Sequence, residues 1–274
     1  MFGRLREAPQ RASRWKLSAT AGLLVLLTGL LTASAAMAGK PTGEFAVFKD
    51  CPLSTIGVNW CVYSKTTGGE LTLGKMSVPI VNPIVLQGGL IVTEKEETFV
   101  NPTEGVTLSK TAETVTGGFE KTTLTATLEL VGSVTLSRKK LAAGEGTAIG
   151  LPTRVHLKNE FLGESCFIGS STEPITLNLT TGTTTPPPPN KAIKGTPGTF
   201  ESKEGGTLEV FSGDSLVENA FSVPGAKGCG GSEESLIDPI LDAKFGLPSA
   251  AGHNTAIMKG TSEFATAEAV RKSE

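Results

Sequence analysis

Apolar and polar residues alternate most regularly between positions 122 and 138, which read TTLTATLELVGSVTLSR. One face of an extended chain here would carry Leu124, Ala126, Leu128 and Leu130. The other face would carry threonines and Glu129, so the pattern predicts a strand with one buried and one wet side. Shorter runs of the same kind predict further strands at 45–52, 58–64, 69–76, 154–159, 166–169, 175–180, 206–213, 218–224 and 254–260.

Glycine and proline residues divide these runs. The Gly-containing segment KTTG at 65–68 predicts a hairpin between two of the strands. Pro79 and Pro83 prevent residues 77–92 from forming one regular central strand. Together with 33 glycines and many Thr and Val residues, this punctuation favours a mainly β fold.

One short helix is predicted near 239–245. Asp238 is a candidate N-cap, Pro239 suits the first turn, and Gly246 suits the C-terminal cap. This helix is expected to bury Ile240, Leu241 and Phe245. The predicted fold is an antiparallel β-sandwich or open barrel of several short strands with this one helix.

The first 38 residues have the pattern of a secretory signal peptide. A basic stretch ends at Lys16, the apolar segment AGLLVLLTGLL follows at 21–31, and Ala36-Met37-Ala38 fits the small-x-small rule for cleavage. We therefore expect export, removal of residues 1–38, and a secreted or cell-surface protein without a membrane span. The alternative is a retained anchor, because the uncharged stretch 17–39 is just long enough to cross a bilayer.

Cleavage changes the charge of the protein. The first 38 residues hold five of the 25 basic residues and one of the 27 acidic ones, which leaves 20 basic and 26 acidic residues in 39–274. A chain with this acidic balance gains nothing from phosphate backbones, so nucleic-acid binding is set aside.

Four cysteines remain after the leader: Cys51, Cys61, Cys166 and Cys229. An even number in an exported protein predicts disulfides, and four cysteines allow three pairings. We favour Cys51–Cys61 and Cys166–Cys229, because the turn-like segment PLSTIGVN can return the chain between the first two. The spacings do not resemble the close pairs of structural zinc sites.

Residues 180–190, TTGTTTPPPPN, form the clearest low-complexity segment. Four consecutive prolines favour a stiff, solvated polyproline II segment. It is either a linker between two domains or a connection within one. We favour a single mainly β unit over 39–274, because a Cys166–Cys229 bond would join the segments on either side.

A resemblance to other proteins is carried by four segments together: FAVFKDCP, the VPI-then-LQGG stretch, LPTRVHLKNEFLGESCFIGS, and FSVPGAKGCGG with GLPSAAGHNTAI. They resemble a group of uncharacterised exported proteins of soil actinobacteria, and the similarity covers most of 39–274. The resemblance implies export. It carries over no activity, cofactor or functional residue.

Catalytic residue types are scarce in the sequence. The two histidines are His156 and His253, and no G-x-S-x-G motif occurs. If Val155 and Leu157 point inward, His156 lies on the outer face of a strand as a surface residue, and His253 is predicted to lie in a loop. Ser137 and Lys140 have Ser-x-x-Lys spacing, but the basic SRKK sequence predicts a solvated turn rather than a buried catalytic helix.

Metal and sugar sites are equally weakly indicated. Glu94, Glu96 and Glu97 form a polar corner and GSEES lies at 231–235, but no D-x-D-x-D loop supports calcium. Trp60 and Tyr63 are three positions apart, so an extended strand places them on opposite faces and not on one stacking platform. The glycine-rich runs lack the context of a nucleotide loop. We expect no metal and no cofactor.

The sequence thus favours an exported, non-catalytic surface or envelope-associated β protein with an unidentified envelope or extracellular partner. One alternative is a secreted hydrolase with an unrecognised Glu/His site, which would bring His156 and an acid together in a cleft. Another is a small-ligand carrier, which would hold an apolar cavity between its sheets.

Overall fold

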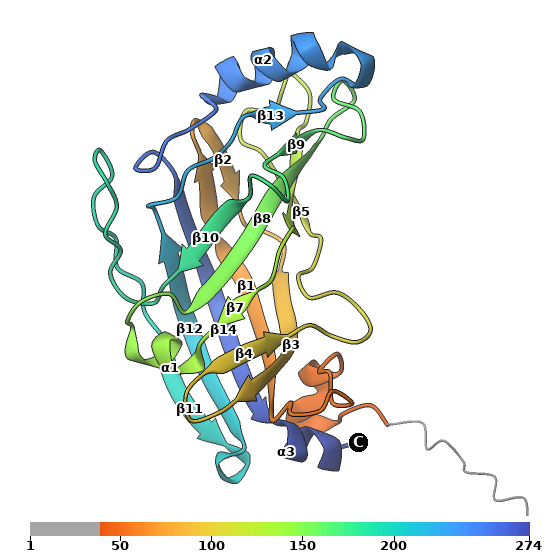
Figure 1. Cartoon of the computed structure of the whole chain (residues 1–274), viewed down its shortest axis with the longest axis vertical. Coiled ribbons are helices and arrows are strands. Elements are labelled where there is room, and N and C mark those ends of the chain that lie inside the picture. Colours follow the sequence, from red (N-terminus) through yellow and green to blue (C-terminus); the bar gives the residue numbers. More distant parts are fainter. Residues whose placement is uncertain (1–38) are drawn as a thin grey trace, which may run out of the picture. The chain divides into compact units, whose positions relative to one another are not determined.

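A computed structural model describes residues 39–274, and it is mainly β (Figure 1). Its strands form two sheets in which every pairing is antiparallel. This confirms the predicted fold class in its sandwich form. The predicted signal peptide, residues 1–38, lies outside the described residues. Within the described part, no helix has the length and apolar character needed to cross a membrane.

The first sheet is built around two long central strands. Its order is β11-β12-β14-β1-β3-β4, and β2 pairs with β1 beyond the bulge in that strand. The strands are β1 (Trp60–Leu73), β2 (Met76–Pro79), β3 (Ile84–Val92), β4 (Glu97–Val100), β11 (Thr199–Lys203), β12 (Leu208–Glu218) and β14 (Thr255–Thr266).

The second sheet is centred on β8. Its order is β13-β9-β8-β6-β5, and β7 and β10 pair with the first half of β8. The strands are β5 (Ala112–Thr114), β6 (Thr125–Leu130), β7 (Thr135–Leu136), β8 (Ile149–Lys158), β9 (Phe167–Ile168), β10 (Ile175–Leu179) and β13 (Ala226–Lys227).

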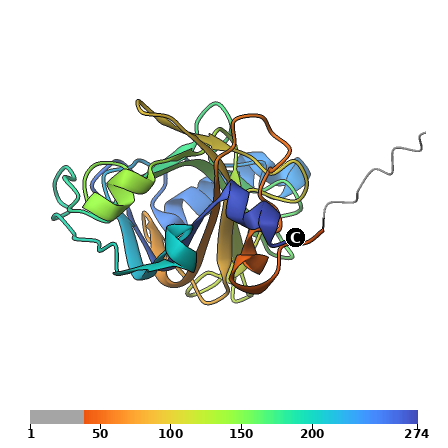
Figure 2. The same ribbon diagram turned by 90° about the horizontal axis from the view of Figure 1, so that it is seen from below.

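The main core lies between the two sheets, and a smaller one lies on the far face of the first sheet. The main core contains the predicted inward row, with Leu124, Ala126 and Leu128 buried and Leu130 packed at its margin. The smaller core contains Cys61 and is covered by the 3-10 helix η1 (Gly43–Phe48) and by α3 (Ala267–Lys272). Both views show η1 and α3 side by side (Figure 1, Figure 2).

The prediction of a strand at 45–52 was wrong, because η1 occupies its first half. Phe45 and Phe48 are both buried in the smaller core. Residues three apart share one side of a 3-10 helix but lie on opposite faces of a strand. The smaller core lies on only one side of this segment. A helix can bury both phenylalanines there, whereas a strand would expose one of them.

The predicted hairpin at 65–68 was also wrong, because β1 continues straight through it. The register with β14 shifts between Thr66 and Gly68, which marks a bulge. Gly69 has φ of 114°, and a Cβ there would lie 1.9 Å from the carbonyl oxygen of Ile257. Glycine at this point permits close approach of two strands and does not turn the chain.

Helix α2 (Glu234–Phe245) begins five residues before the predicted start at 239. Asp238 does not cap it. Its carboxylate accepts hydrogen bonds from the backbone N–H groups of Gly228 and Cys229. Leu241 and Phe245 are buried as predicted, but Ile240 is 41 % exposed. Gly246 ends the helix with φ of 64°. The remaining helices are α1 (Arg138–Ala143), η2 (Glu204–Gly206) and η3 (Gly231–Glu233).

The Thr/Pro-rich segment 180–190 is tied to strands of the first sheet. Thr180 pairs with Val217, and the side-chain amide of Asn190 donates to the carbonyl oxygens of Asn219 and Asn254. The described residues, 39–274, form one compact unit that includes this segment. Here it acts as a connection within that unit.

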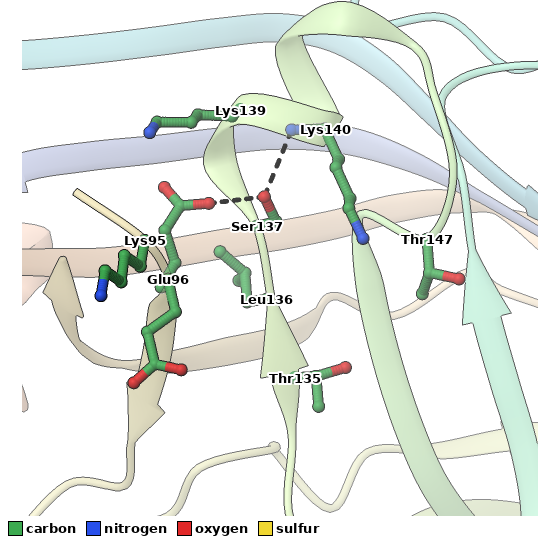
Figure 3. A pocket seen from close by; sticks show the side chains of 9 residues that line it. Lys95, Glu96, Thr135, Leu136, Ser137, Lys139, Lys140 and Thr147 are labelled. Atoms are coloured by element: carbon green, nitrogen blue, oxygen red, sulfur yellow. Dashed lines mark hydrogen bonds between the residues drawn. The ribbon is translucent and has the colours of Figure 1, made fainter. Parts of the chain in front are cut away.

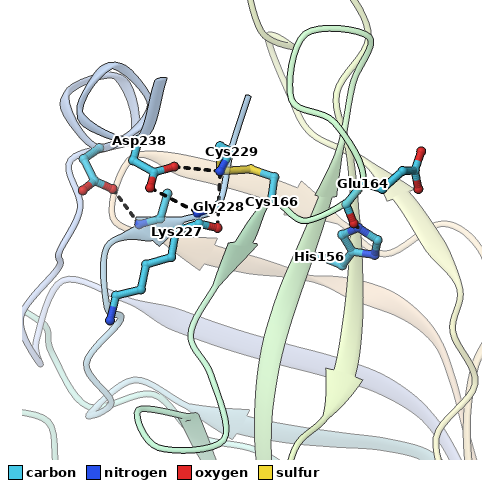
Figure 4. Close-up of a disulfide and its surroundings, with 9 residues drawn as sticks. His156, Glu164, Cys166, Lys227, Gly228, Cys229 and Asp238 are labelled. Atoms are coloured by element: carbon cyan, nitrogen blue, oxygen red, sulfur yellow. Dashed lines mark hydrogen bonds between the residues drawn. A yellow bond between two sulfur atoms is a disulfide. The ribbon is translucent and has the colours of Figure 1, made fainter. Parts of the chain in front are cut away.

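Both disulfides are present, in the pairing that the sequence favoured: Cys51–Cys61 and Cys166–Cys229. The first bond joins the segment after η1 to β1. The second bond joins Cys166, the residue before β9, to the turn that precedes α2, beside the carboxylate of Asp238 (Figure 4).

Candidate functional site

Helix α1 is short and is fixed at both ends. The hydroxyl oxygen of Ser137 accepts a hydrogen bond from the backbone N–H of Lys140, and Gly144 closes the helix with φ of 67°. Leu141 is fully buried, and the Thr181 hydroxyl donates to its carbonyl oxygen. The prediction of a solvated turn at SRKK was therefore wrong, because these capping groups and one buried leucine stabilise a helix.

Ser137 is nevertheless not arranged as a Ser/Lys nucleophile. Its hydroxyl donates to a carboxylate oxygen of Glu97, and its partner in Lys140 is the backbone nitrogen. The side chain of Lys140 runs away from that hydroxyl, toward Thr147 (Figure 3). The serine acts as a cap and as a link between sheets, since it follows β7 and Glu97 begins β4.

Arg138 fixes α1 onto the first sheet. Its Nη1 lies 2.7 and 2.6 Å from the two carboxylate oxygens of Glu209, and its guanidinium carbon lies 3.9 Å from the centroid of the Trp60 ring. Its Nε faces Oε1 of Glu97 at 3.9 Å, and both of these atoms are buried without a hydrogen-bond partner. Residues on three strands of the first sheet, β1, β4 and β12, thus hold Arg138, which comes shortly after β7 of the second sheet.

Two cavities lie on either side of α1. The first has a volume of about 630 Å³ and is lined by Lys95, Glu96, Glu97, Thr135, Leu136, Ser137, Lys139, Lys140 and Thr147 (Figure 3). The second has a volume of about 430 Å³ and is lined by Arg138, Lys139, Ala142, Pro197, Gly198, Phe200, Glu209 and Phe211. Lys139 lines both cavities, so the two are neighbours across its side chain.

His156 lies on the outer face of β8, as predicted, while Val155 and Leu157 are buried. Its Nδ1 lies 3.9 Å from Oε1 of Glu129, and its Nε2 donates to the backbone carbonyl of Glu164 at 3.1 Å (Figure 4). The ring stacks on Phe167 with centroids 4.5 Å apart. With Nε2 held by a backbone carbonyl, the ring is placed as a structural element and not as a base beside a nucleophile.

Glu129 is the centre of this cluster. Its side chain is 9 % exposed, and its Oε2 accepts hydrogen bonds from Nε and Nη2 of Arg154. Its Oε1 forms an ion pair with Nζ of Lys110 at 3.2 Å. Burial raises the pKa of Glu129, but the hydrogen bonds and charges of Arg154 and Lys110 outweigh burial and hold the pKa below its ordinary value.

Replacing Glu129 by glutamine is expected to lower the free energy of unfolding by about 2 kcal/mol at pH 7. The pKa of Glu129 is lower in the folded protein than in the unfolded chain. This stabilisation is therefore present at neutral pH and is lost as pH falls through the folded-state pKa. Urea unfolding of the wild type and of Glu129→Gln at pH 7 and pH 3 measures it. Glu173→Gln, which removes an exposed pair with Lys227, is the matched control and should change little. Equal effects of the two variants at pH 7 would contradict the argument.

The other candidate residues do not converge. His253 is exposed in the turn before β14, and Glu94 and Glu96 are exposed while Glu97 is taken up by Ser137 and Arg138. Within residues 39–274, no three His, Cys, Asp or Glu side chains are grouped as metal ligands. Trp60 packs against the main core and Tyr63 against the smaller one, so they face opposite sides of β1 as predicted.

Sequence reasoning did not find the site around α1. Arg138, Lys139 and Phe200 had no assigned role. The local signals were the Ser137 cap and the Gly144 stop, with six residues between them. Comparison with family models, curated proteins and solved structures gave no match. The site is therefore interpreted from its own chemistry.

Proposed function

We propose that this chain is an exported, non-catalytic β protein of the cell surface or extracellular space, and that it binds a ligand in the two cavities beside α1. Two disulfides are typical of proteins that work in oxidising surroundings. The leader-like residues 1–38 and the resemblance to exported actinobacterial proteins support the same location.

The adjoining cavities at Lys139 carry this proposal. Their volumes, about 630 and 430 Å³, fall within the range of small-ligand sites. Two apolar cavities between the sheets measure only about 10 and 20 Å³, room for about one water molecule at most. A ligand is therefore better accommodated beside α1 than in the core, which favours a surface binding protein over a carrier with an internal pocket.

The arrangement of His156 supports a binding role over hydrolysis. A hydrolase of the Glu/His type needs the histidine to face a nucleophile or a water in a cleft. Here its Nε2 is bonded to the carbonyl of Glu164, and its ring is covered by Phe167. Glu129 on its other side is engaged by Arg154.

The test uses isotopically labelled protein recovered from the culture medium and a ligand library of anions, sugars, amphiphiles and peptides. Binding is expected to shift amide resonances of α1, of β4 and of residues 197–200, with no turnover of any compound. Retention of the protein inside the cell would contradict the export. Shifts confined to another surface, or turnover abolished by His156→Ala, would contradict the binding role.

A further inference from the structure

The first cavity is suited to an anionic group. Among the described residues, Lys95, Lys139 and Lys140 form no ion pair, so their ammonium groups are available to a ligand. The hydroxyl groups of Thr135 and Thr147 add neutral donors on the same lining. Ammonium groups with hydroxyl donors are suited to a carboxylate or phosphate, because hydrogen bonds to an ionised acceptor are the strong ones.

The two glutamates on this lining do not cancel its preference. Oε2 of Glu97 accepts from Ser137 and its Oε1 faces Nε of Arg138, so both carboxylate oxygens are directed into the protein, and the side chain is only 5 % exposed. Glu96 is exposed to solvent, where its repulsion of a bound anion is screened. The three lysines exceed the two glutamates by one charge over the lining.

The second cavity is suited to hydrocarbon. Its wall is formed by Phe200, Phe211, Pro197 and Ala142, and Phe200 is 54 % exposed. Phe200 packs against Phe211 with centroids 5.1 Å apart, and Phe211 packs edge-on against the buried Phe264. The exposed ring is thus firmly supported from below. Covering it with apolar ligand atoms removes apolar surface from water.

Two charged residues of the second cavity pair with each other. Nη1 of Arg138 donates to both carboxylate oxygens of Glu209. Lys139 stands between the two cavities, and lysine commonly lays its methylene stem on apolar surface while its ammonium group stays in a polar one. A ligand that spans this residue must change from polar to apolar along its length.

We propose that the ligand is a free anionic amphiphile, with a carboxylate or phosphate head in the first cavity and a hydrocarbon tail against Phe200 in the second. This inference rests on the proposed function and adds the chemical class of its ligand. The head is held by Lys95, Lys139 and Lys140, and the tail covers the aromatic wall. The head and the tail contribute separately to the affinity. A lysine substitution should therefore weaken only the binding of the head, and a Phe200 substitution only that of the tail.

The experiment is isothermal titration of the full, oxidised protein with dodecyl phosphate and dodecanoate, kept below their critical micelle concentrations. Both are expected to bind, and neutral dodecyl glucoside is expected to bind at least about tenfold more weakly. Lys139→Gln, Lys140→Gln and Phe200→Ser are each expected to weaken dodecyl phosphate binding by about tenfold. Inorganic phosphate, which lacks the tail, should bind far more weakly than dodecyl phosphate.

Matched controls are available elsewhere on the surface. Lys191→Gln removes an exposed lysine that directly follows the 180–190 segment. Phe161→Ser removes a phenylalanine that is 51 % exposed and precedes Leu162, whose carbonyl oxygen accepts from Gly230. Neither should change the affinity. Circular dichroism of each variant shows whether a loss of binding is a loss of folding.

Three outcomes would overturn the inference. Equal binding of dodecyl glucoside and dodecyl phosphate, with no effect of the lysine variants, would show that the ligand needs no anionic head group. Binding to phosphatidylglycerol vesicles without binding of the monomeric amphiphiles would replace a free ligand by a membrane surface. A different ligand class that shifts the same α1 resonances would leave the proposed function standing and sink the amphiphile alone.

Discussion

Replacing Cys166 and Cys229 together by alanine is expected to lower the free energy of unfolding by about 4 kcal/mol. The bond closes a loop with a sequence separation of 63 residues, so its removal releases much chain entropy in the unfolded state. Chemical denaturation of the oxidised wild type and of the double variant measures the difference. An unchanged free energy of unfolding would contradict the role of this bond.

The structural effect of this change should be local as well as global. Strand β13 pairs with β9 through only two residue pairs, Ala226 with Ile168 and Lys227 with Phe167. The disulfide and the two hydrogen bonds to Asp238 hold the adjoining turn against α2 (Figure 4). Without the bond, hydrogen exchange of the α2 amides is expected to rise first, while β1 and β14 remain protected.

Cys51 and Cys61 provide a matched comparison. Their bond has a sequence separation of 10, so the same entropy model gives about 3 kcal/mol for the double alanine variant. Cys61 is as fully buried as Cys166 and Cys229, but Cys51 is only partly buried, so the loss of packing is smaller for this pair. A larger loss for the shorter loop would show that loop entropy is not the dominant contribution.

The parts of the fold that were predictable depend on local patterns. The alternation at 124–130 correctly predicts the inward face of β6, because strand period acts residue by residue. It does not predict that Glu129, on the expected wet face, is buried beside Arg154 and Lys110. The same rule placed His156 outward and separated Trp60 from Tyr63. The strand prediction at 45–52 was wrong for a related reason. The alternation of residue types does not show that the core lies on one side of this segment, where Phe45 and Phe48 both pack.

The site around α1 was beyond sequence reasoning for a different reason. Arg138 meets Glu97, Glu209 and Trp60, which come from three strands distant from it in the chain. No spacing along the sequence predicts those contacts, because they follow from how the two sheets pack. Phe200 lies on a short edge strand, where an exposed aromatic ring is locally indistinguishable from a core residue. The contact between sheets creates the cavities.

A row of buried polar groups crosses the first sheet and is expected to make its stability depend on pH. Asp214 on β12 is 3 % exposed and accepts a hydrogen bond from the Ser262 hydroxyl on β14 at 2.6 Å. Ser262 in turn lies 2.9 Å from the hydroxyl of Ser64 on β1. Burial raises the pKa of Asp214 from 3.8 to about 6, although Ser262 and the backbone of Gly260 favour the ionised form.

The direction of the pH effect follows from this raised pKa. The folded protein holds the Asp214 proton to about pH 6, whereas the unfolded chain releases it near pH 4. The stabilisation is therefore complete below about pH 4 and is lost as pH rises through about 6. Its size is about 3 kcal/mol, the free-energy equivalent of that difference in pKa.

Asp214→Asn is expected to remove this dependence and to make the protein more stable than wild type at pH 7.5, by up to about 3 kcal/mol. The asparagine fits the row, because its oxygen can accept from Gly260 and its amide can donate to Ser262, which then donates to Ser64. Urea unfolding between pH 4 and pH 8 measures the effect as the difference between variant and wild type. Burial also raises the pKa of Glu263, so only the difference isolates Asp214.

Ser262→Ala tests the same row in the opposite sense. It removes a hydroxyl that favours the ionised carboxylate, so the pKa of Asp214 should rise further and the loss of stability should shift to higher pH. Glu104→Gln, at an exposed carboxylate, should leave the pH profile unchanged. If Asp214→Asn instead follows the wild-type profile from pH 4 to pH 8, the buried carboxylate is not the source of the pH dependence, and the argument from its burial is wrong.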